Sequence, residues 1–172
     1  MENKIYIKNR LTICSKENNW LYKYTYNPYL VNFHQENSDY NGNLTFTKQF
    51  ENISIQFYND FIKNELSLTT ELNNIDQYTF FGCTSDALHV DFAYYDNKLI
   101  YQFVTESWYP RNWYKFIKLK YPHLDFSLEY IIQDENEISV QKEKFCFCIS
   151  ESESHNMYKN LNTNHKSYKK VD

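Results

Sequence analysis

Apolar and polar residues alternate between Leu88 and Thr105, and this pattern constrains the fold of the chain more than any other feature. Two runs with a period of two, typical of strands with one buried side, flank Asp96-Asn97, and both residue types tolerate the positive φ of a tight turn. Pairing Tyr95 with Lys98 gathers one set of side chains on one face: Leu88, Val90, Phe92 and Tyr94 beside Thr105, Phe103, Tyr101 and Leu99. We therefore predict an antiparallel hairpin with this face in the core. The reverse face is predicted to meet water or a partner and carries His89, Asp91 and Ala93 beside Val104, Gln102 and Ile100.

Apolar spacing predicts the other elements as well. In chain order these are a strand over 5–13, a helix over 53–66, the hairpin, a helix between Pro110 and Tyr121-Pro122, a strand over 126–131, and a hairpin joining 138–141 to 145–149. The first helix is predicted to bury Ile53, Phe57, Phe61 and Ile62, and the second to bury Tyr109, Trp113, Phe116 and Ile117. Residues 15–43 show no clean period and are predicted to form an irregular insertion with short helical or strand pieces.

Strand, helix, hairpin, helix, strand is the element order of a ferredoxin-like domain. The sequence therefore predicts an α+β fold, a ferredoxin-like antiparallel sheet with two helices on one face, an N-terminal insertion and an extra C-terminal hairpin. With 172 residues the chain is long enough to bury a core in one domain, which we place at 1–150. From Glu151 onward the chain is polar, so residues 151–172 are predicted to form a mobile tail.

Charge and hydropathy argue against several classes of protein. The net charge of −4 is unfavourable for a chain that mainly neutralises nucleic-acid phosphates. No apolar run approaches the roughly 18 residues of a membrane span, and the first residues lack the apolar core of a signal peptide. We therefore expect a cytoplasmic protein without a membrane partner, whose four cysteines are reduced thiols.

Four strings of this sequence resemble one family in the same order. They lie at residues 9–13 (Asn-Arg-Leu-Thr-Ile), 81–87, 103–110 and 121–130, and the Trp-x-Pro and Tyr-Pro that bound the second predicted helix are the strongest parts. These strings resemble the Api92-like ferredoxin-like proteins of phages and plasmids. The chain departs from the family where Gly82, Thr84 and Asp86 stay in register but the family's Trp and Lys are replaced, and it lacks the family's N-terminal Trp-Cys. The resemblance implies a ferredoxin-like accessory protein of a mobile element, and it carries over no catalytic residues.

A metal site is one chemical possibility. Cys146 and Cys148 place two sulfurs on one strand face, with His155 and Cys14 as further candidate ligands. Zinc knuckles usually separate their cysteines by two residues, and the Phe-rich surroundings of this pair indicate buried structural thiols. We therefore expect no metal and no cofactor.

Catalysis is a second possibility. Cys83 follows Gly82, but a chain with 2 glycines has little backbone freedom to build a nucleophile elbow or an oxyanion hole. His89 and Asp91 on one strand would form an acid–base cluster with Glu129 of a neighbouring strand, as in a hydrolase or nuclease, only if the three converge. An ordinary hydrogen-bonded sheet surface is the favoured interpretation, so we expect no enzyme.

Single-stranded nucleic acid is a third possibility, because many ferredoxin-like domains stack bases on the open face of the sheet. The candidate residues are Tyr6, Lys8 and Arg10 on the first strand and the basic row Arg111, Lys115 and Lys118 on the second helix. Only Tyr6 offers an aromatic platform there, and Asp91 and Glu129 on the same face repel phosphate. Nucleic acid is therefore the less favoured partner.

Protein binding remains. Between Glu71 and Glu106 there are six acids and only one base, Lys98. The stretch is either a solvated strand edge with acidic turns or an acidic surface that imitates a nucleic-acid backbone, with Asp86, Asp91 and Glu106 as its candidate contacts. A second candidate is the aromatic stretch that includes Trp20, Tyr22 and Tyr24, since Tyr and Trp contribute most per contact at interfaces. The alternative that this stretch is one face of an amphipathic strand stays open.

These observations together predict a non-enzymatic phage or mobile-element protein that binds and inhibits a host protein. A nucleic-acid-guided defence effector, as bound by anti-CRISPR proteins, is the candidate partner, and a single-stranded nucleic-acid-binding module is the alternative.

Overall fold

The computed structural model describes residues 4–17, 27–95, 97–133 and 168–172. Its centre is one antiparallel sheet with the strand order β2-β3-β1-β4-β5. The strands are β1 (Tyr6–Ser15), β2 (Leu88–Tyr95), β3 (Lys98–Glu106), β4 (Leu124–Gln133) and β5 (Lys169–Lys170). The α+β class is confirmed, and the order of the first four strands is consistent with the predicted ferredoxin-like arrangement.

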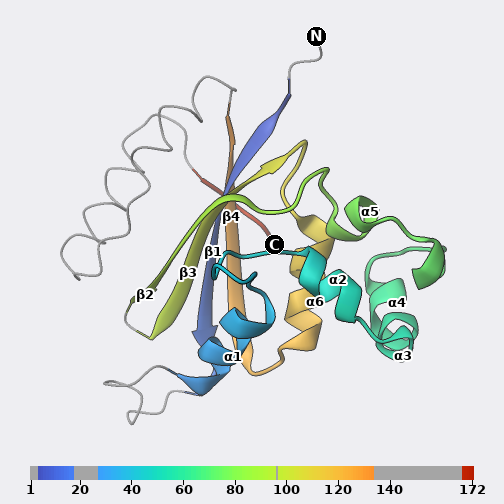
Figure 1. The fold of residues 1–172 in the computed structure, drawn as a ribbon, viewed down its shortest axis with the longest axis horizontal. Coiled ribbons are helices and arrows are strands. Elements are labelled where there is room, and N and C mark those ends of the chain that lie inside the picture. Colours follow the sequence, from blue (N-terminus) through green and yellow to red (C-terminus); the bar gives the residue numbers. More distant parts are fainter. Residues whose placement is uncertain (1–3, 18–26, 96, 134–167) are drawn as a thin grey trace.

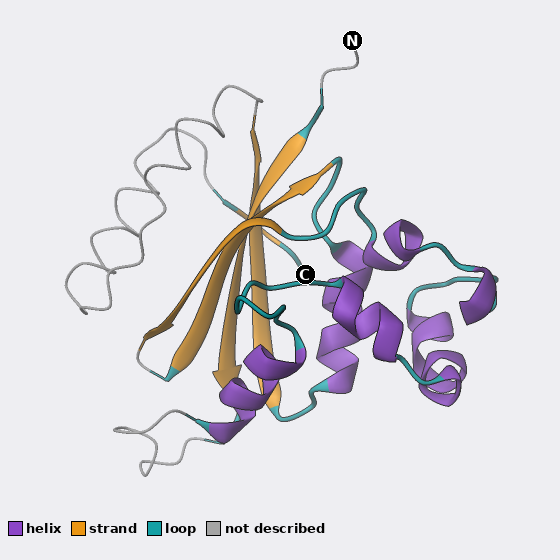
Figure 2. Ribbon diagram, viewed as in Figure 1, coloured by secondary structure: helices purple, strands orange, loops and turns teal. Residues whose placement is uncertain are grey.

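The described helices lie together on one face of this sheet (Figures 1 and 2). They are α1 (Pro28–Glu36), α2 (Thr47–Asn52), α3 (Ile55–Phe57), the π-helical η2 (Tyr58–Ile62), α4 (Lys63–Glu65), the 3-10 turn η3 (Leu72–Asn74), α5 (Gln77–Phe81) and α6 (Arg111–Lys120). All except α6 belong to the connection between β1 and β2. The predicted helix over 53–66 is present as the continuous segment α3–η2–α4, and further short helices that were not predicted lie before and after it in the same connection.

The β2–β3 hairpin confirms most of the predicted register. Tyr95 pairs with Lys98, and Phe92 pairs with Tyr101. Nearer the start of β2 the register shifts, so that Leu88 pairs with Val104 and not with Thr105. His89 sits in this shift with a φ of 50°, the local distortion by which a strand takes up an extra residue.

The two faces of the hairpin differ less in burial than predicted. On the helix-covered face Tyr101 and Phe103 are fully buried, but Phe92 is 39% exposed and packs against the His34 ring at 4.4 Å. On the reverse face Ile100, Gln102 and Val104 are also buried, so the prediction that this face meets water is wrong for β3. The reason is that β3 is apolar on both sides, as in strands that are covered on both faces.

The connection from residue 27 to 43 contains one short helix, α1, within the insertion for which short helical or strand pieces were predicted. The Asn27 side chain caps α1 by accepting a hydrogen bond from the Tyr29 N–H at 2.9 Å, and Pro28 occupies the first turn. Leu30 and Phe33 then point into the core. The cap and the Pro at this position were a start signal that the lack of a long period obscured.

Helix α6 has the predicted bounds and the predicted inward residues. Trp113, Phe116 and Ile117 are buried, while Tyr109, just before the helix, is partly buried. Gly82, at a φ of 83°, ends α5 where a Cβ atom would lie 2.9 Å from the Asn112 backbone nitrogen, so this glycine lets α5 approach the first turn of α6.

The last described residues belong to the sheet. Lys169 and Lys170 pair with Tyr130 and Glu129 of β4, and the Val171 N–H donates to the Leu128 carbonyl at 2.8 Å. The mobile-tail prediction therefore fails for residues 168–172, because Val171 also packs against the core. The predicted hairpin at 138–149 and the rest of the predicted tail lie outside the described residues.

Candidate functional site

Negative charge is concentrated in the helical layer, which we define as the connection formed by residues 27–86. It contains eight acidic residues and two lysines, a formal charge of −6, whereas the whole chain carries −4. The remainder of the chain therefore carries +2. The eight acids are Glu36, Asp39, Glu51, Asp60, Glu65, Glu71, Asp76 and Asp86. Figure 1 shows that the helices of this connection cover one face of the sheet.

Both lysines of the helical layer are held by internal contacts. The Lys48 ammonium donates to the carbonyl oxygens of Gln35 at 2.7 Å and Ser38 at 3.0 Å, at the C-terminal end of α1 where helix carbonyls lack partners. Lys63 forms an ion pair with Glu71. Neither cation is therefore directed at a partner.

Three acids of the layer are exposed and unpaired. The side chains of Glu51, Asp60 and Glu65 form no hydrogen bond or ion pair with any residue that the structure describes. Other acids of the layer form hydrogen bonds within the fold: Asp76 caps α5, and Glu36 accepts a hydrogen bond from the Tyr121 hydroxyl. The negative electrostatic potential of the layer therefore comes mainly from carboxylates that face solvent.

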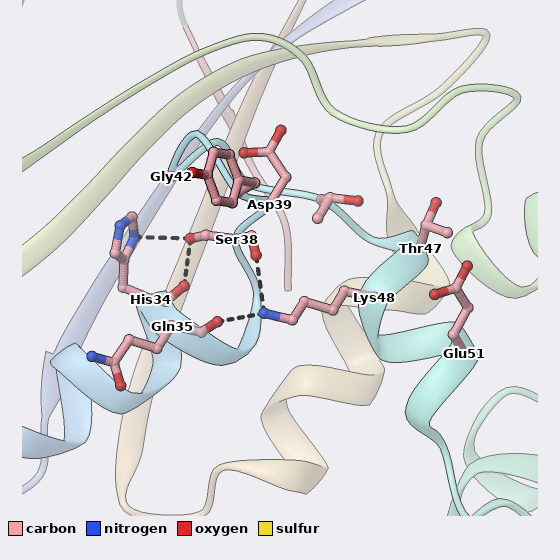
Figure 3. Close-up of a pocket in the computed structure, with 10 residues that line it drawn as sticks. His34, Gln35, Ser38, Asp39, Gly42, Thr47, Lys48 and Glu51 are labelled. Atoms are coloured by element: carbon pink, nitrogen blue, oxygen red, sulfur yellow. Dashed lines mark hydrogen bonds between the residues drawn. The ribbon is translucent and has the colours of Figure 1, made fainter.

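A hollow of about 560 Å³ opens between the end of α1 and the start of α2 (Figure 3). The residues that line it include His34, Ser38, Asp39, Lys48 and Glu51. Asp39 shapes the adjoining loop, because its Oδ1 accepts from the N–H groups of Asn41 and Asn43, both at 2.9 Å. The fully exposed Tyr40 follows it at the loop tip.

His34 connects this hollow to the core of the sheet. Its Nδ1 lies 2.6 Å from the hydroxyl of the buried Tyr101, and burial raises the pKa of that hydroxyl, so Tyr101 donates and the neutral imidazole accepts. Burial also lowers the pKa of His34. The Ser38 hydroxyl oxygen lies 3.2 Å from the same Nδ1, but its proton is donated to the His34 carbonyl. The arrangement therefore orients α1 on β3 and does not make Ser38 a nucleophile with His34 as its base.

The predicted acidic contacts do not form one surface. Asp86 is a structural carboxylate: it accepts from the Thr45 hydroxyl and the Phe46 N–H, both at 2.7 Å, from the Thr47 hydroxyl at 2.8 Å, and from the Ala87 N–H at 2.7 Å. These bonds hold the start of α2 and leave little of Asp86 for a partner.

The other two members of that set lie elsewhere on the sheet. Asp91 is half-buried on the reverse face, where burial raises its pKa. Glu106 is partly buried at the end of β3 and pairs with Lys4 at 3.2 Å. Trp20, Tyr22 and Tyr24 lie outside the described residues.

Charged and polar side chains line the reverse face of the sheet, and several of them are buried or paired. Asp91, Gln102, Arg10, Glu129 and Lys170 are successive cross-strand neighbours, one from each strand. Arg10 pairs with Glu129 at 2.5 Å, and its guanidinium lies 4.5 Å from the centre of the Tyr168 ring. Gln102 is 1% exposed and Lys8 is 2% exposed. This face therefore does not offer Lys8 and Arg10 as phosphate contacts, and Tyr6 beside them is only partly exposed.

The basic row on α6 is where the sequence predicted it. Arg111 and Lys118 are exposed and Lys115 is partly exposed, opposite the buried Trp113. The Lys118 ammonium lies 5.3 Å from the centre of the Tyr114 ring.

The candidate catalytic residues are dispersed or protected. Cys83 is buried, its Sγ donates to the Ser85 carbonyl, and burial raises its pKa to about 12, so it is a neutral thiol at physiological pH. Asp91 and Glu129 are separated by β3 and β1, which at the usual strand spacing is about 14 Å. His89 is exposed in the register shift of β2.

Two further findings concern only the part of the chain that the structure describes. There, no three His, Cys, Asp or Glu side chains gather as metal ligands, while Cys146, Cys148 and His155 lie outside it. None of its helices has the length and apolar character needed to cross a membrane.

The acidic helical layer and the His34–Tyr101 contact were not among the features predicted from the sequence. The signal for the layer was present, since only two lysines occur between residues 27 and 86, but it emerges only when the connection is counted as one unit. Compared with known proteins, the chain matches no family model, no curated protein and no solved structure.

Proposed function

We propose that this chain is a non-enzymatic protein-binding module whose acidic helical layer occupies a basic surface of a partner protein. Such a layer fits best on a basic surface that binds nucleic acid, because the layer presents carboxylates as a nucleic acid presents phosphates.

One observation carries the proposal. The layer bears a charge of −6, and its two lysines are tied to main-chain carbonyls and to Glu71. Complementary charge of this kind speeds encounter and selects partners more than it adds affinity. The partner-binding carboxylates proposed here are thus the exposed Glu51, Asp60 and Glu65 of the helical layer, in place of the set Asp86, Asp91 and Glu106.

The resemblance to mobile-element proteins supports a ferredoxin-like assignment for the fold and a host protein in the host cytoplasm as the partner. A nucleic-acid-guided defence effector, as inhibited by anti-CRISPR proteins, combines a host protein with a basic nucleic-acid channel. Inhibition would follow from occupying that channel.

The test compares two variants that remove the same charge from different regions. One neutralises the exposed acids of the layer (Glu51→Gln, Asp60→Asn, Glu65→Gln), and the control neutralises Glu17→Gln, Asp125→Asn and Asp172→Asn. We expect the wild-type chain and the control to retain a host protein from nuclease-treated lysate, nucleic acid to displace it, and the layer variant to bind at least tenfold more weakly. Equal retention by all three proteins would refute the proposal.

The alternative, a single-stranded nucleic-acid-binding module, is supported by the exposed side chains of Arg111 and Lys118 on α6. It predicts retention of single-stranded DNA or RNA at low salt, with steep loss as salt rises. Reversing Arg111, Lys115 and Lys118 to Glu would abolish that retention. We expect no retention by the wild-type chain.

A further inference from the structure

The two edges of the described sheet differ in how well they are protected against pairing with another chain. The β5 edge has 2 residues, Lys169 and Lys170, and both are exposed. A short edge strand that carries lysines is a common protection, because its charge disfavours a further strand. The β2 edge (Figure 1) has 8 residues without Lys, Arg or Pro and with a single acid, Asp91. Among the described strands, β2 is therefore the less protected edge.

Hydrogen bonds at the end of β3 show which way its backbone groups point. The Glu106 N–H donates to the Ser85 hydroxyl at 2.9 Å, and its carbonyl accepts from the Thr84 N–H at 3.2 Å, both just before β2. The next N–H, of Ser107, donates to the Ile5 carbonyl at 2.8 Å, just before β1. Successive residues of an antiparallel strand face its two neighbours alternately, so the even-numbered residues of β3 face β2 and the odd-numbered ones face β1.

This alternation extends across the hairpin to Phe92. Asp91 and Ala93 pair with the even-numbered Gln102 and Ile100, and they therefore bond to β3. Phe92 pairs with Tyr101, which faces β1, so the N–H and C=O of Phe92 point away from β3 to the outer edge. No hydrogen bond from a described residue reaches these two groups.

The side chain of Phe92 is ordered at the same edge. Its ring centre lies 4.4 Å from that of His34 and 6.0 Å from that of Tyr101, and the side chain is 39% exposed. An aromatic ring that is held by its neighbours loses little conformational entropy when a second ring packs on it. Phe92 thus combines unpaired main-chain groups with a fixed apolar side chain.

We propose that β2 pairs with β2 of a second copy of this chain, antiparallel and with Phe92 opposite Phe92. The two residues then exchange two N–H···O bonds, and their rings meet on the helix-covered face. On the reverse face, Asp91 of each copy lies opposite Ala93 of the other. A register centred on Asp91 would place two carboxylates opposite each other, so the charge favours the register centred on Phe92. A two-fold axis then relates the copies.

This pairing goes beyond the proposed function and does not depend on it. Paired residues keep their faces in a continuous sheet, so the helical layers of both copies lie on the same side. The like charges of the two layers repel each other, and salt screens that repulsion. Self-association is therefore measured at high salt.

The first test uses the wild-type chain. Sedimentation velocity is recorded between about 1 and 100 µM, and amide hydrogen exchange is followed by NMR over the same range. We expect the dimer fraction to rise with concentration and the exchange of the Phe92 N–H to slow as it does. The N–H groups of Asp91 and Ala93 are protected by β3 at every concentration. A monomer throughout, or Phe92 exchange that stays constant as dimer forms, would overturn the inference.

A matched pair of lysine variants tests the side chain. Phe92→Lys places two like charges opposite each other, and the control, Phe61→Lys, changes another exposed phenylalanine. Phe61 lies on η2, where it was predicted to be buried but is 52% exposed, because the π turn adds a residue to the helical repeat. We expect dimerisation to weaken at least tenfold in Phe92→Lys and less than twofold in the control. Equal dimerisation by the two variants would place the contact elsewhere and refute the pairing.

Disulfide trapping tests the register without relying on a variant that disrupts the dimer. In the proposed pairing, cysteines introduced by Phe92→Cys lie about 5.5 Å apart between Cα atoms, within the range of a disulfide. Those introduced by Ala93→Cys are diagonal neighbours at about 8 Å, beyond that range. Under mild oxidation we expect Phe92→Cys to form a covalent dimer at least tenfold faster than Ala93→Cys, with the wild type as the reference for the native cysteines. Equal rates for the two variants would contradict the register.

Discussion

The helical layer and the reverse face of the sheet use the same kinds of charged residue in opposite ways. On the reverse face, Arg10 and Glu129 pair with each other and Lys8 is buried. In the helical layer, Glu51, Asp60 and Glu65 stand in solvent without a partner among the described residues. Surface ion pairs and isolated surface charges contribute little to stability, whereas a buried charge has a large effect when its surroundings change. The carboxylates available for binding a partner are therefore those that form no hydrogen bond or ion pair within the fold.

The largest expected change in the free energy of unfolding concerns Asp86, an acid of the layer whose carboxylate accepts hydrogen bonds within the fold. Asp86→Ala removes four hydrogen bonds, three of them with residues 45–47 at the start of α2, and leaves the N–H of Phe46 without its partner. We expect a loss of about 3 kcal/mol in the free energy of unfolding, measured with urea. Asp60→Ala, an exposed acid of the same layer, should change it by less than about 0.5 kcal/mol. A loss below about 1 kcal/mol for Asp86→Ala would show that Asp86 is as free as Asp60.

Lys8 tests the buried charge of the reverse face. Burial, and then the nearby Arg10 charge, lowers the pKa of its amine to about 8, from the usual 10.5. Between pH 8 and 10.5 the unfolded chain therefore binds more protons than the folded chain, so stability rises with pH across this window. Relative to Lys8→Met, the wild type should gain on the order of 2 kcal/mol from pH 8 to 10. A constant difference between the two proteins would place Lys8 in water.

The His34–Tyr101 contact tests the junction between the helical layer and the sheet face that it covers. The pKa of His34 in the folded chain is lowered below 6.5 by burial, so its contribution to stability is complete above pH 6.5 and is lost as pH falls through the folded value. Relative to His34→Gln, the wild type should lose stability on acidification. Tyr101→Phe should cost about 1 kcal/mol at neutral pH. An unchanged pH profile in His34→Gln would contradict the assignment.

The smallest effect on stability belongs to the proposed binding acids. Glu51→Gln, Asp60→Asn and Glu65→Gln together should change the free energy of unfolding by no more than about 0.5 kcal/mol, because none of the three side chains bonds to a residue that the structure describes. Thermal unfolding at low and high salt measures this. A loss above about 1 kcal/mol would show that these acids have a structural role after all.

Much of the fold could be predicted because it rests on local spacing. The period of two around the β2–β3 turn predicted the pairing of Tyr95 with Lys98, and the period of 3.6 predicted the inward face of α6. The register shift at His89 and the π turn at Tyr58–Ile62 were missed, since both insert a residue into a regular period and leave no sign in composition.

The candidate site was harder to predict because it depends on contacts between distant residues. Asp86 looked available in the sequence, yet Thr45 and Thr47, which bind it, lie about 40 residues earlier. Likewise, Tyr101 lies 67 residues from His34, its hydrogen-bond partner. Local charge counts cannot distinguish a carboxylate that is used from one that is unused.

The central position of β1 has a consequence for how the chain folds during synthesis. Both neighbours of β1 are made much later: Cys14 pairs with Lys98, 84 residues on, and with Asp125. At ordinary translation rates of 5–20 residues per second, β1 waits roughly 4 to 17 seconds before its first strand partner has been synthesised. Non-local pairing of this kind also slows refolding. An aggregation-prone stage, with Ile7, Leu11 and Ile13 exposed, therefore precedes closure of the sheet.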